Sequence, residues 1–535
     1  MPALVEALPA STPMVLFAPR LSTALSDTTT LLVWLSTVEP SLAVRDPAAP
    51  DGDDAKPTTL DLVASLWRSP GGAVEAGAVR SFDDLARIGI DANAPVAIVP
   101  DRGGEVVVVI LGLSSRKRFE AWLSSVEGKA RTHVKIGGER ASVIAATSDA
   151  PVVCLARQKH VYCQVGRVDP RTPVDPLKRL LEFDGPTIGK SKPRMDAFSA
   201  LPEGAHFYAT VWPKGLVGVI GDRQTDHAKA EARFLDKAAA QEHLRRARID
   251  RTRMEYYATY VPGAAAGLYP DDDGVRLETQ LVLNAEGRRL LAHAVPNGAP
   301  DSMIARWART PSLFSLLVRT HPDMLRALAS EEGVELPAGS MTGTFAMMTL
   351  GVDAECPSAR HREKIRPHRW AFLLPSAAAV GVVSSEHANH VHTALGRELK
   401  IAPRKKDTRA PDRPALTGRA WGSPFHVEVL DDMVLVGTGR GSGAAALRRL
   451  GALPPPSPRT KEAAPFLEMR VDLRAVDAAF AAGAFSPDEH RTELLALEAL
   501  RLQMKPLLST VNRVSLEARK HDDGQRVSFS AQLGR

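Results

Sequence analysis

The stretch Val514-Ser-Leu-Glu-Ala-Arg-Lys-His-Asp-Asp-Gly524-Gln-Arg-Val527-Ser-Phe-Ser-Ala-Gln-Leu533, near the end of the chain, decides the fold class. Apolar and polar side chains alternate on both sides of a turn that ends at Gly524. Alternation with a period of two around a glycine turn is typical of two antiparallel strands that bury one face. The stretch therefore predicts a β-hairpin with one buried face.

The same form occurs at two earlier places in the chain. Residues 264–283 alternate around Asp271-Asp-Asp-Gly274, and residues 94–113 alternate around Asp101-Arg-Gly-Gly104. Aspartate is favoured in such turns because its side chain bonds the local backbone and tolerates positive φ. We therefore interpret these carboxylates as turn residues rather than as catalytic groups.

Other elements also recur in the same order along the chain. They are edge-like strands that open at Met14, Phe207 and Pro465, strands that run into the serine pairs 114–115 and 384–385, and late hairpins over 152–165 and 425–436. This order predicts repeat units over 1–190 and 191–455 and a partial third unit over 456–535. The hairpins near 94–113 and 369–383 are expected to be equivalent.

Antiparallel sheets must bury at least one face, so we expect amphipathic helices to cover them. Residues 228–249 are predicted as one such helix, with Phe234, Leu235 and Ile249 among the residues that face inward. The predicted fold class is therefore α+β, built from repeated units of antiparallel sheet (hairpins) covered by amphipathic helices. The expected linkers are rich in proline and lie at 39–58, 402–415 and 453–465.

Composition limits the classes of partner and location. The chain has 535 residues, a net charge of +6 with basic and acidic residues mixed throughout, and only 5% aromatic residues. A nucleic-acid partner would require a gathered basic face and stacking platforms, so we expect none. We also expect no signal peptide, because the start has no basic region, and no transmembrane segment, because no apolar run approaches roughly 20 residues.

Two of the three cysteines lie symmetrically about one turn. Cys154 and Cys163 are equally far from Gln158-Lys159, so a two-residue hairpin there places them opposite each other as a non-hydrogen-bonded pair. Such a pair can form a disulfide in an oxidising compartment. The alternative is two small apolar residues in a strand pair that stay as thiols. No Cys-x-x-Cys spacing of a structural zinc site occurs.

A glycine-rich turn follows the strand that ends at Val436. It leads into a helix, and its backbone amides could bind an anion around Gly439, Gly441, Ser442 and Gly443. The preceding strand belongs to a hairpin, so the parallel crossover of a dinucleotide fold is missing. A flexible strand-to-helix turn is the alternative interpretation.

No complete catalytic or metal-binding motif occurs in the sequence. Gly185-Pro-Thr-Ile-Gly189-Lys190-Ser191 ends like a P-loop, but it has three residues between its glycines where four are needed, and helical sequence precedes it. His387, His390 and His392 cannot share one face of a helix. We therefore predict no catalytic residue, no metal site and no cofactor.

Three motifs carry a resemblance to a known family. They are the Leu8-Pro9 start, the sequence Leu85-Ala-Arg-Ile-Gly-Ile-Asp91 before Ala94-Pro-Val-Ala-Ile98, and the hairpin Asp431-Asp-Met-Val-Leu-Val-Gly437. With these motifs the chain resembles a family of uncharacterised bacterial proteins, often exported, that carry a repeated domain of unknown function. The resemblance implies internal repeats and a place in the cell envelope or periplasm, and it implies no catalytic residues.

Duplication without a catalytic motif favours a non-catalytic binding or scaffolding protein that uses repeated sheet surfaces. The resemblance implies a protein associated with the envelope and another envelope protein as its partner; the cytoplasm is the other location compatible with the sequence. The alternative is an enzyme, or a nucleotide- or anion-responsive protein, with its site at residues 437–443. A deep pocket with convergent polar groups would favour this alternative.

Overall fold

We describe the fold from a computed structural model of the chain. The structure describes residues 1–23, 82–100, 106–126, 132–144, 152–166, 174–234, 236–271, 274–295, 303–323, 326, 330, 341–353, 374–383, 415–420, 423–430, 433–438, 465–475, 513–521 and 525–534. The predicted linkers lie almost wholly outside these residues.

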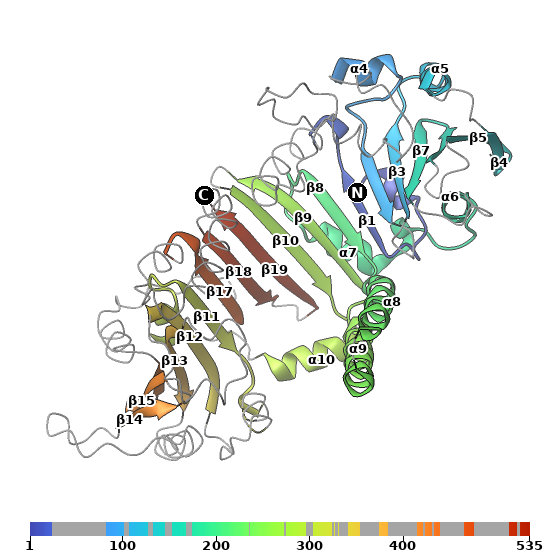
Figure 1. Cartoon of the computed structure of the whole chain (residues 1–535). Helices are drawn as coiled ribbons and strands as arrows, with labels where there is room; N and C mark the ends of the chain where they lie inside the picture. The colour runs from blue at the N-terminus through green and yellow to red at the C-terminus, as the bar shows by residue number, and fades with distance from the viewer. Residues whose placement is uncertain are drawn as a thin grey trace, which may run out of the picture. The chain divides into compact units, whose positions relative to one another are not determined.

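The chain forms two compact units (Figure 1). Unit 1 comprises Met1–Pro270 and Leu277–Gly287, and unit 2 comprises Asp271–Arg276 and Arg288–Arg535. This division differs from the boundaries predicted at 190 and 455. A boundary at 190 would separate β1 (Met14–Ala18) from β8 (Phe207–Val211), which pair as antiparallel neighbours. Recurrence in sequence does not reveal such long-range pairing, because the pairing depends on tertiary structure.

Unit 1 contains a sheet with the strand order β10-β9-β8-β1-β2-β3-β7-β6-β5-β4, antiparallel from β9 to β4. Its further strands are β2 (Val96–Pro100), β3 (Val106–Gly112), β4 (Thr132–Ile136), β5 (Glu139–Ile144), β6 (Val152–Arg157), β7 (His160–Gly166), β9 (Gly263–Asp271) and β10 (Gly274–Val282). Its helices are α1 (Ala3–Glu6), α4 (Phe82–Arg87), α5 (Arg116–Val126), α6 (Asp175–Leu181), the 3-10 helix η2 (Ile188–Lys190), α7 (Lys192–Ser199), α8 (Pro213–Ala232) and α9 (Lys237–Ala258). The helix α10 (Ala285–Ala294) contains the division between the units.

Apolar side chains cover both faces of the unit 1 sheet. On β3, Val108 and Ile110 belong to one buried cluster, whereas Leu111 belongs to the other. The first cluster includes residues of α1 and α6, and the second includes Phe119 and Leu123 of α5. Successive side chains of a strand point to opposite faces, so a strand covered on both sides is apolar at nearly every position.

Unit 2 pairs its strands in the order β14-β15-β16-β13-β12-β11-β17-β18-β19, and every neighbouring pair is antiparallel. Its elements are α11 (Met303–Ala308), β11 (Phe314–Arg319), β12 (Met341–Asp353), β13 (Leu374–Val383), β14 (Ala415–Ala420), β15 (Ser423–Leu430), β16 (Met433–Thr438), β17 (Leu467–Asp472), β18 (Arg513–Lys520) and β19 (Arg526–Gly534). The predicted α+β class with antiparallel sheets is confirmed.

The hairpin that decided the fold class forms as predicted, from β18 and β19. Val514 pairs with Leu533, and Ala518 pairs with Phe529, so the alternating apolar residues of β18 and β19 share one face. The serine before α5 caps that helix, because the Ser115 hydroxyl accepts a hydrogen bond from the Arg118 amide at 3.3 Å.

The single helix predicted over 228–249 is wrong, because the chain turns between α8 and α9. The Asp236 carboxylate accepts hydrogen bonds from the amides of Ala238 and Ala239, so a new helix begins there. Phe234, expected to face inward, is 90% exposed in this turn, and Ile249 is 36% exposed. Apolar spacing alone predicts one continuous helix here. It does not detect the aspartate N-cap that begins a second helix.

None of the helices in the described part of the chain combines the length and the apolar character that crossing a bilayer requires.

Candidate functional site

A pocket of about 260 Å³ lies in unit 1, where the segment before β1 meets α6 and the hairpin of β2 and β3. Its lining is largely apolar and unusually rich in proline. The residues that line it are Pro9, Ser11, Thr12, Pro13, Val99, Pro100, Val108, Pro176, Arg179, Leu180 and Phe183. We call this cavity the proline pocket.

A buried arginine fixes one wall of the proline pocket. Arg194 of α7 is only 1% exposed, and its guanidinium donates to the carbonyl oxygens of Ala10 at 3.2 Å and Thr12 at 2.9 Å. The same group donates to the hydroxyl and the carbonyl oxygen of Thr210 on β8, both at 3.0 Å. Arg194 therefore ties the segment that forms the wall to the neighbouring strand and helix.

Burial of the Arg194 guanidinium costs free energy, because the charged group leaves water. All four hydrogen bonds of the Arg194 guanidinium go to neutral oxygens, and burial lowers the pKa of Arg194 to about 10. A buried charge without a carboxylate partner opposes folding unless its donors are satisfied. The hydrogen bonds that satisfy the guanidinium donors also hold residues 10–12 in one conformation.

A buried amide fixes the opposite wall. Gln164 on β7 is fully buried, and its side-chain oxygen accepts a hydrogen bond from the amide of Leu177 at 3.0 Å. That amide lies in the first turn of α6, where backbone donors have no partner within the helix. At the other end of α6, Glu182 accepts a hydrogen bond from the amide of Gly137 at 2.5 Å. Both ends of α6 are thus anchored, which sets the positions of Pro176 and Leu180.

The lining contains one basic side chain and two hydroxyl groups. Arg179 on α6 contributes a positive charge at an exposed position, and Ser11 and Thr12 contribute hydroxyl groups. Among the residues that line the pocket there is no histidine, cysteine, aspartate or glutamate. A hydroxyl nucleophile needs an adjacent base, and the described lining contains no side chain that would act as this base.

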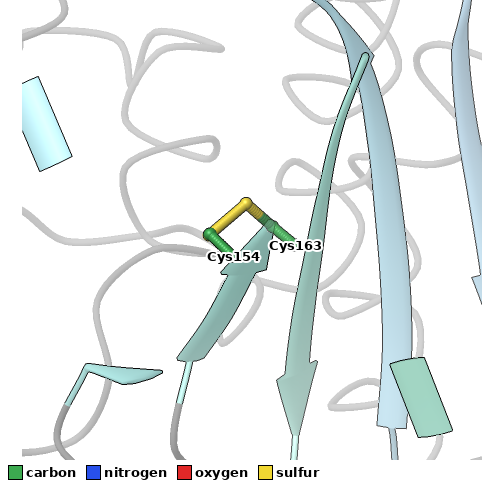
Figure 2. The surroundings of a disulfide bond; sticks show 2 residues. All are labelled: Cys154 and Cys163. Atoms are coloured by element: carbon green, nitrogen blue, oxygen red, sulfur yellow. A yellow bond between two sulfur atoms is a disulfide. The ribbon is translucent and has the colours of Figure 1, made fainter. Parts of the chain in front are cut away.

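The two candidate cysteines face each other in the β6–β7 hairpin and form a disulfide (Figure 2). Their Cα atoms are 4.2 Å apart, and both residues are 2% exposed within the cluster that packs against α5. Gln158, in the turn, has a φ of 52°, a value that turns of this kind require. The register is the one that counting outward from Gln158-Lys159 predicts.

The anion-binding candidates Gly439, Gly441, Ser442 and Gly443 lie outside the described residues, which end there at Thr438 of β16. Residues 185–191, which resemble a P-loop, lie between α6 and α7. The Ile188 amide in this segment donates to the carbonyl oxygen of Leu8 at 2.8 Å. The segment therefore supports the N-terminal segment of unit 1 and does not follow a strand directly.

The described residues contain no group of three or more histidine, cysteine, aspartate or glutamate side chains that could hold a metal ion. Sequence reasoning did not find the proline pocket. Arg194, Gln164 and the lining prolines are scattered over distant segments, and no motif marks them.

Comparison with known proteins gives limited information. No family model and no curated protein matches the chain. Among solved structures, crystal form I of TP0453 is 9% identical with a TM-score of 0.23, over 52% of this chain and 80% of that one. Crystal form III of TP0453 has the same identity and TM-score, over 54% of this chain and 84% of that one. TM-scores this low support no inference about function.

Proposed function

We propose that the chain is a non-catalytic binding protein of the cell envelope, whose proline pocket takes a small ligand with an apolar body and one anionic group. The observation that carries this proposal is the bracing of both pocket walls by buried polar side chains, Arg194 and Gln164. A preformed site loses less conformational freedom on binding than one that must be ordered by its ligand.

The chemistry of the lining supports this class of ligand. Proline, valine and leucine side chains and Phe183 favour an apolar body, because its burial removes apolar surface from water. Arg179 favours a carboxylate, sulfonate or similar group, since a guanidinium binds such groups with charge-assisted hydrogen bonds. The absence of a general base from the described lining supports binding rather than catalysis.

Two observations support the location. The Cys154–Cys163 disulfide is a bond that persists in oxidising compartments and is rare in the cytosol. The resemblance to an often exported family points the same way. Another envelope protein is the macromolecular partner that this location implies.

Internal duplication is part of the proposal. If β8, β9 and β10 correspond to β17, β18 and β19, the described strands of unit 1 other than β4 follow the same order as the described strands of unit 2, which supports this part of the proposal. Under this correspondence the repeat boundary lies near residue 287 rather than at 190 and 455. The chain then has two units with a similar strand order, and both can take part in binding.

The pocket can be tested with 1-anilinonaphthalene-8-sulfonate, an apolar anion whose fluorescence rises on binding. We expect the full chain to bind it at one site and Arg179→Gln to weaken binding about tenfold, because a charge-assisted hydrogen bond is lost. Ser11→Trp, a change at an exposed position of the lining, should block the site.

Lys178→Gln is the matched control, because Lys178 is the exposed neighbour of Arg179 on α6 and does not line the pocket. It should leave the dissociation constant unchanged. Equal binding by the wild type, Arg179→Gln and Ser11→Trp would place the probe elsewhere and refute the proposed site.

A further inference from the structure

The antiparallel helices α8 and α9 form a helical hairpin that exposes an unusual amount of apolar surface. Among the described residues of the chain, the large apolar side chains that are exposed are Leu16, Ile220, Phe234, Ile249, Tyr256, Tyr257, Leu277 and Leu290. Five of these eight belong to α8, α9 or the turn between them. Single exposed apolar residues are ordinary, but such a concentration on one element indicates contact with a partner.

Phe234 is the most exposed of them, at 90%, and it lies in the turn at the tip of the hairpin. The flanking residues Arg233, Asp236 and Lys237 are also exposed, as is Glu231 at the end of α8. The tip therefore presents an aromatic ring to solvent.

Four charged residues surround Phe234, two acidic and two basic. Asp236 is engaged as the N-cap of α9, and Glu231 pairs with His243 at 3.0 Å. By contrast, neither Arg233 nor Lys237 has an ion-pair partner within the described residues. Both carboxylates at the tip are thus engaged within the hairpin, whereas the two cations have no ion-pair partner among the described residues. Over residues 213–258 the hairpin carries ten lysines and arginines against seven aspartates and glutamates, so its net charge is positive.

We propose that the tip of the α8–α9 hairpin docks on an anionic lipid surface, with Phe234 inserted among the acyl chains and Arg233 and Lys237 at the headgroups. An exposed apolar side chain combined with flanking basic residues is the combination that binds such interfaces. The proposal is independent of the proline pocket and of the function proposed for it.

A lipid surface fits the tip better than a protein partner does. A stable protein–protein interface needs about 800 Å² from each partner, with a central cluster of buried anchors and a polar rim. A turn of a few residues with one aromatic side chain offers much less. A membrane needs only shallow insertion, because the lipid closes around the inserted group.

The other exposed aromatic residues provide an internal control. Tyr256 and Tyr257 lie at the opposite end of α9, roughly 30 Å from its start at 1.5 Å per residue. Their rings contact each other, and Tyr256 also contacts Tyr260. If only the tip docks, these tyrosines stay away from the lipid.

The test is sedimentation of the full chain with vesicles of phosphatidylcholine alone and of phosphatidylcholine mixed with phosphatidylglycerol. We expect binding to the mixed vesicles and weak binding to the neutral ones, with a strong decrease at high salt. Phe234→Ala should weaken binding about tenfold or more, because the ring is no longer buried. Arg233→Gln with Lys237→Gln should weaken it by a similar factor, at about fivefold for each charge.

Tyr257→Ala is the matched control, a 65% exposed aromatic residue on the same helix, and it should bind as the wild type does. Phe234→Trp gives a second readout. Because the chain already has seven tryptophans, an inserted indole should make quenching by brominated acyl chains exceed that of the wild type. The proposal is overturned if the wild type does not bind anionic vesicles or if Phe234→Ala binds them with the affinity of the wild type. It is also overturned if Tyr257→Ala loses as much affinity as Phe234→Ala.

Discussion

At the scale of single residues, Arg194 connects three segments of unit 1 through one buried side chain. It is buried, it satisfies its donors with backbone and hydroxyl oxygens, and it joins α7, β8 and the segment before β1. Its sequence neighbourhood, Lys192-Pro-Arg194-Met, contains nothing that distinguishes it from other arginines of the chain. The same side chain thus contributes to stability and to the shape of the proline pocket.

Arg194→Met should destabilise unit 1 by about 2–5 kcal/mol, because several buried oxygens lose their donor. Urea unfolding of the full chain, followed by circular dichroism, measures the change. The exposed Lys192 of the same helix serves as the control, and Lys192→Met should change the free energy of unfolding by less than about 0.5 kcal/mol. Similar stabilities for the two variants would contradict the bracing role.

At the scale of elements, short turns control what the flanking strands or helices bring together. In the β6–β7 hairpin the turn at Gln158-Lys159 sets the register, and the register places Cys154 opposite Cys163 (Figure 2). Between α8 and α9 the Asp236 cap sets the break that exposes Phe234. In each case a short local signal determines where a distinctive side chain lies.

Reduction of the Cys154–Cys163 disulfide should lower the free energy of unfolding by at most about 2–3 kcal/mol, because the closed loop is short and constrains the unfolded chain little. The measurement is urea unfolding with and without dithiothreitol. The double variant Cys154→Ala with Cys163→Ala should show no response to the reductant. Free thiols at both positions in protein purified from its host without reductant would show that the bond does not form in the cell.

At the scale of the whole molecule, long-range pairing defines the units. The pairs β1–β8 and β11–β17 each join strands separated by more than a hundred residues. Such contacts close long loops, so they form only when the intervening elements have a core to pack against. The sheet of unit 1 therefore needs the chain up to β9 and β10 as well as its first 190 residues.

A fragment of residues 1–287 should unfold cooperatively in urea, whereas a fragment of residues 1–190 should not. The shorter fragment lacks β8, which leaves β1 without its partner, and it lacks Arg194, which braces the segment before β1. Circular dichroism and amide hydrogen exchange of both fragments measure the difference. A stable, cooperative fragment of residues 1–190 would restore the boundary predicted from sequence recurrence.

The sequence by itself determined the class of fold and the local registers. Alternation around glycine turns is a property of neighbouring residues, so the β18–β19 hairpin, the cap at Ser115 and the facing of Cys154 and Cys163 could be predicted. Only the tertiary structure decided which strands pair across long distances, where the units divide and which polar residues are buried together. The proline pocket joins segments near residues 10, 100, 108 and 180, and its braces come from residues 164 and 194. No local pattern encodes such a site, because its geometry exists only after distant strands have paired and their side chains have been removed from water.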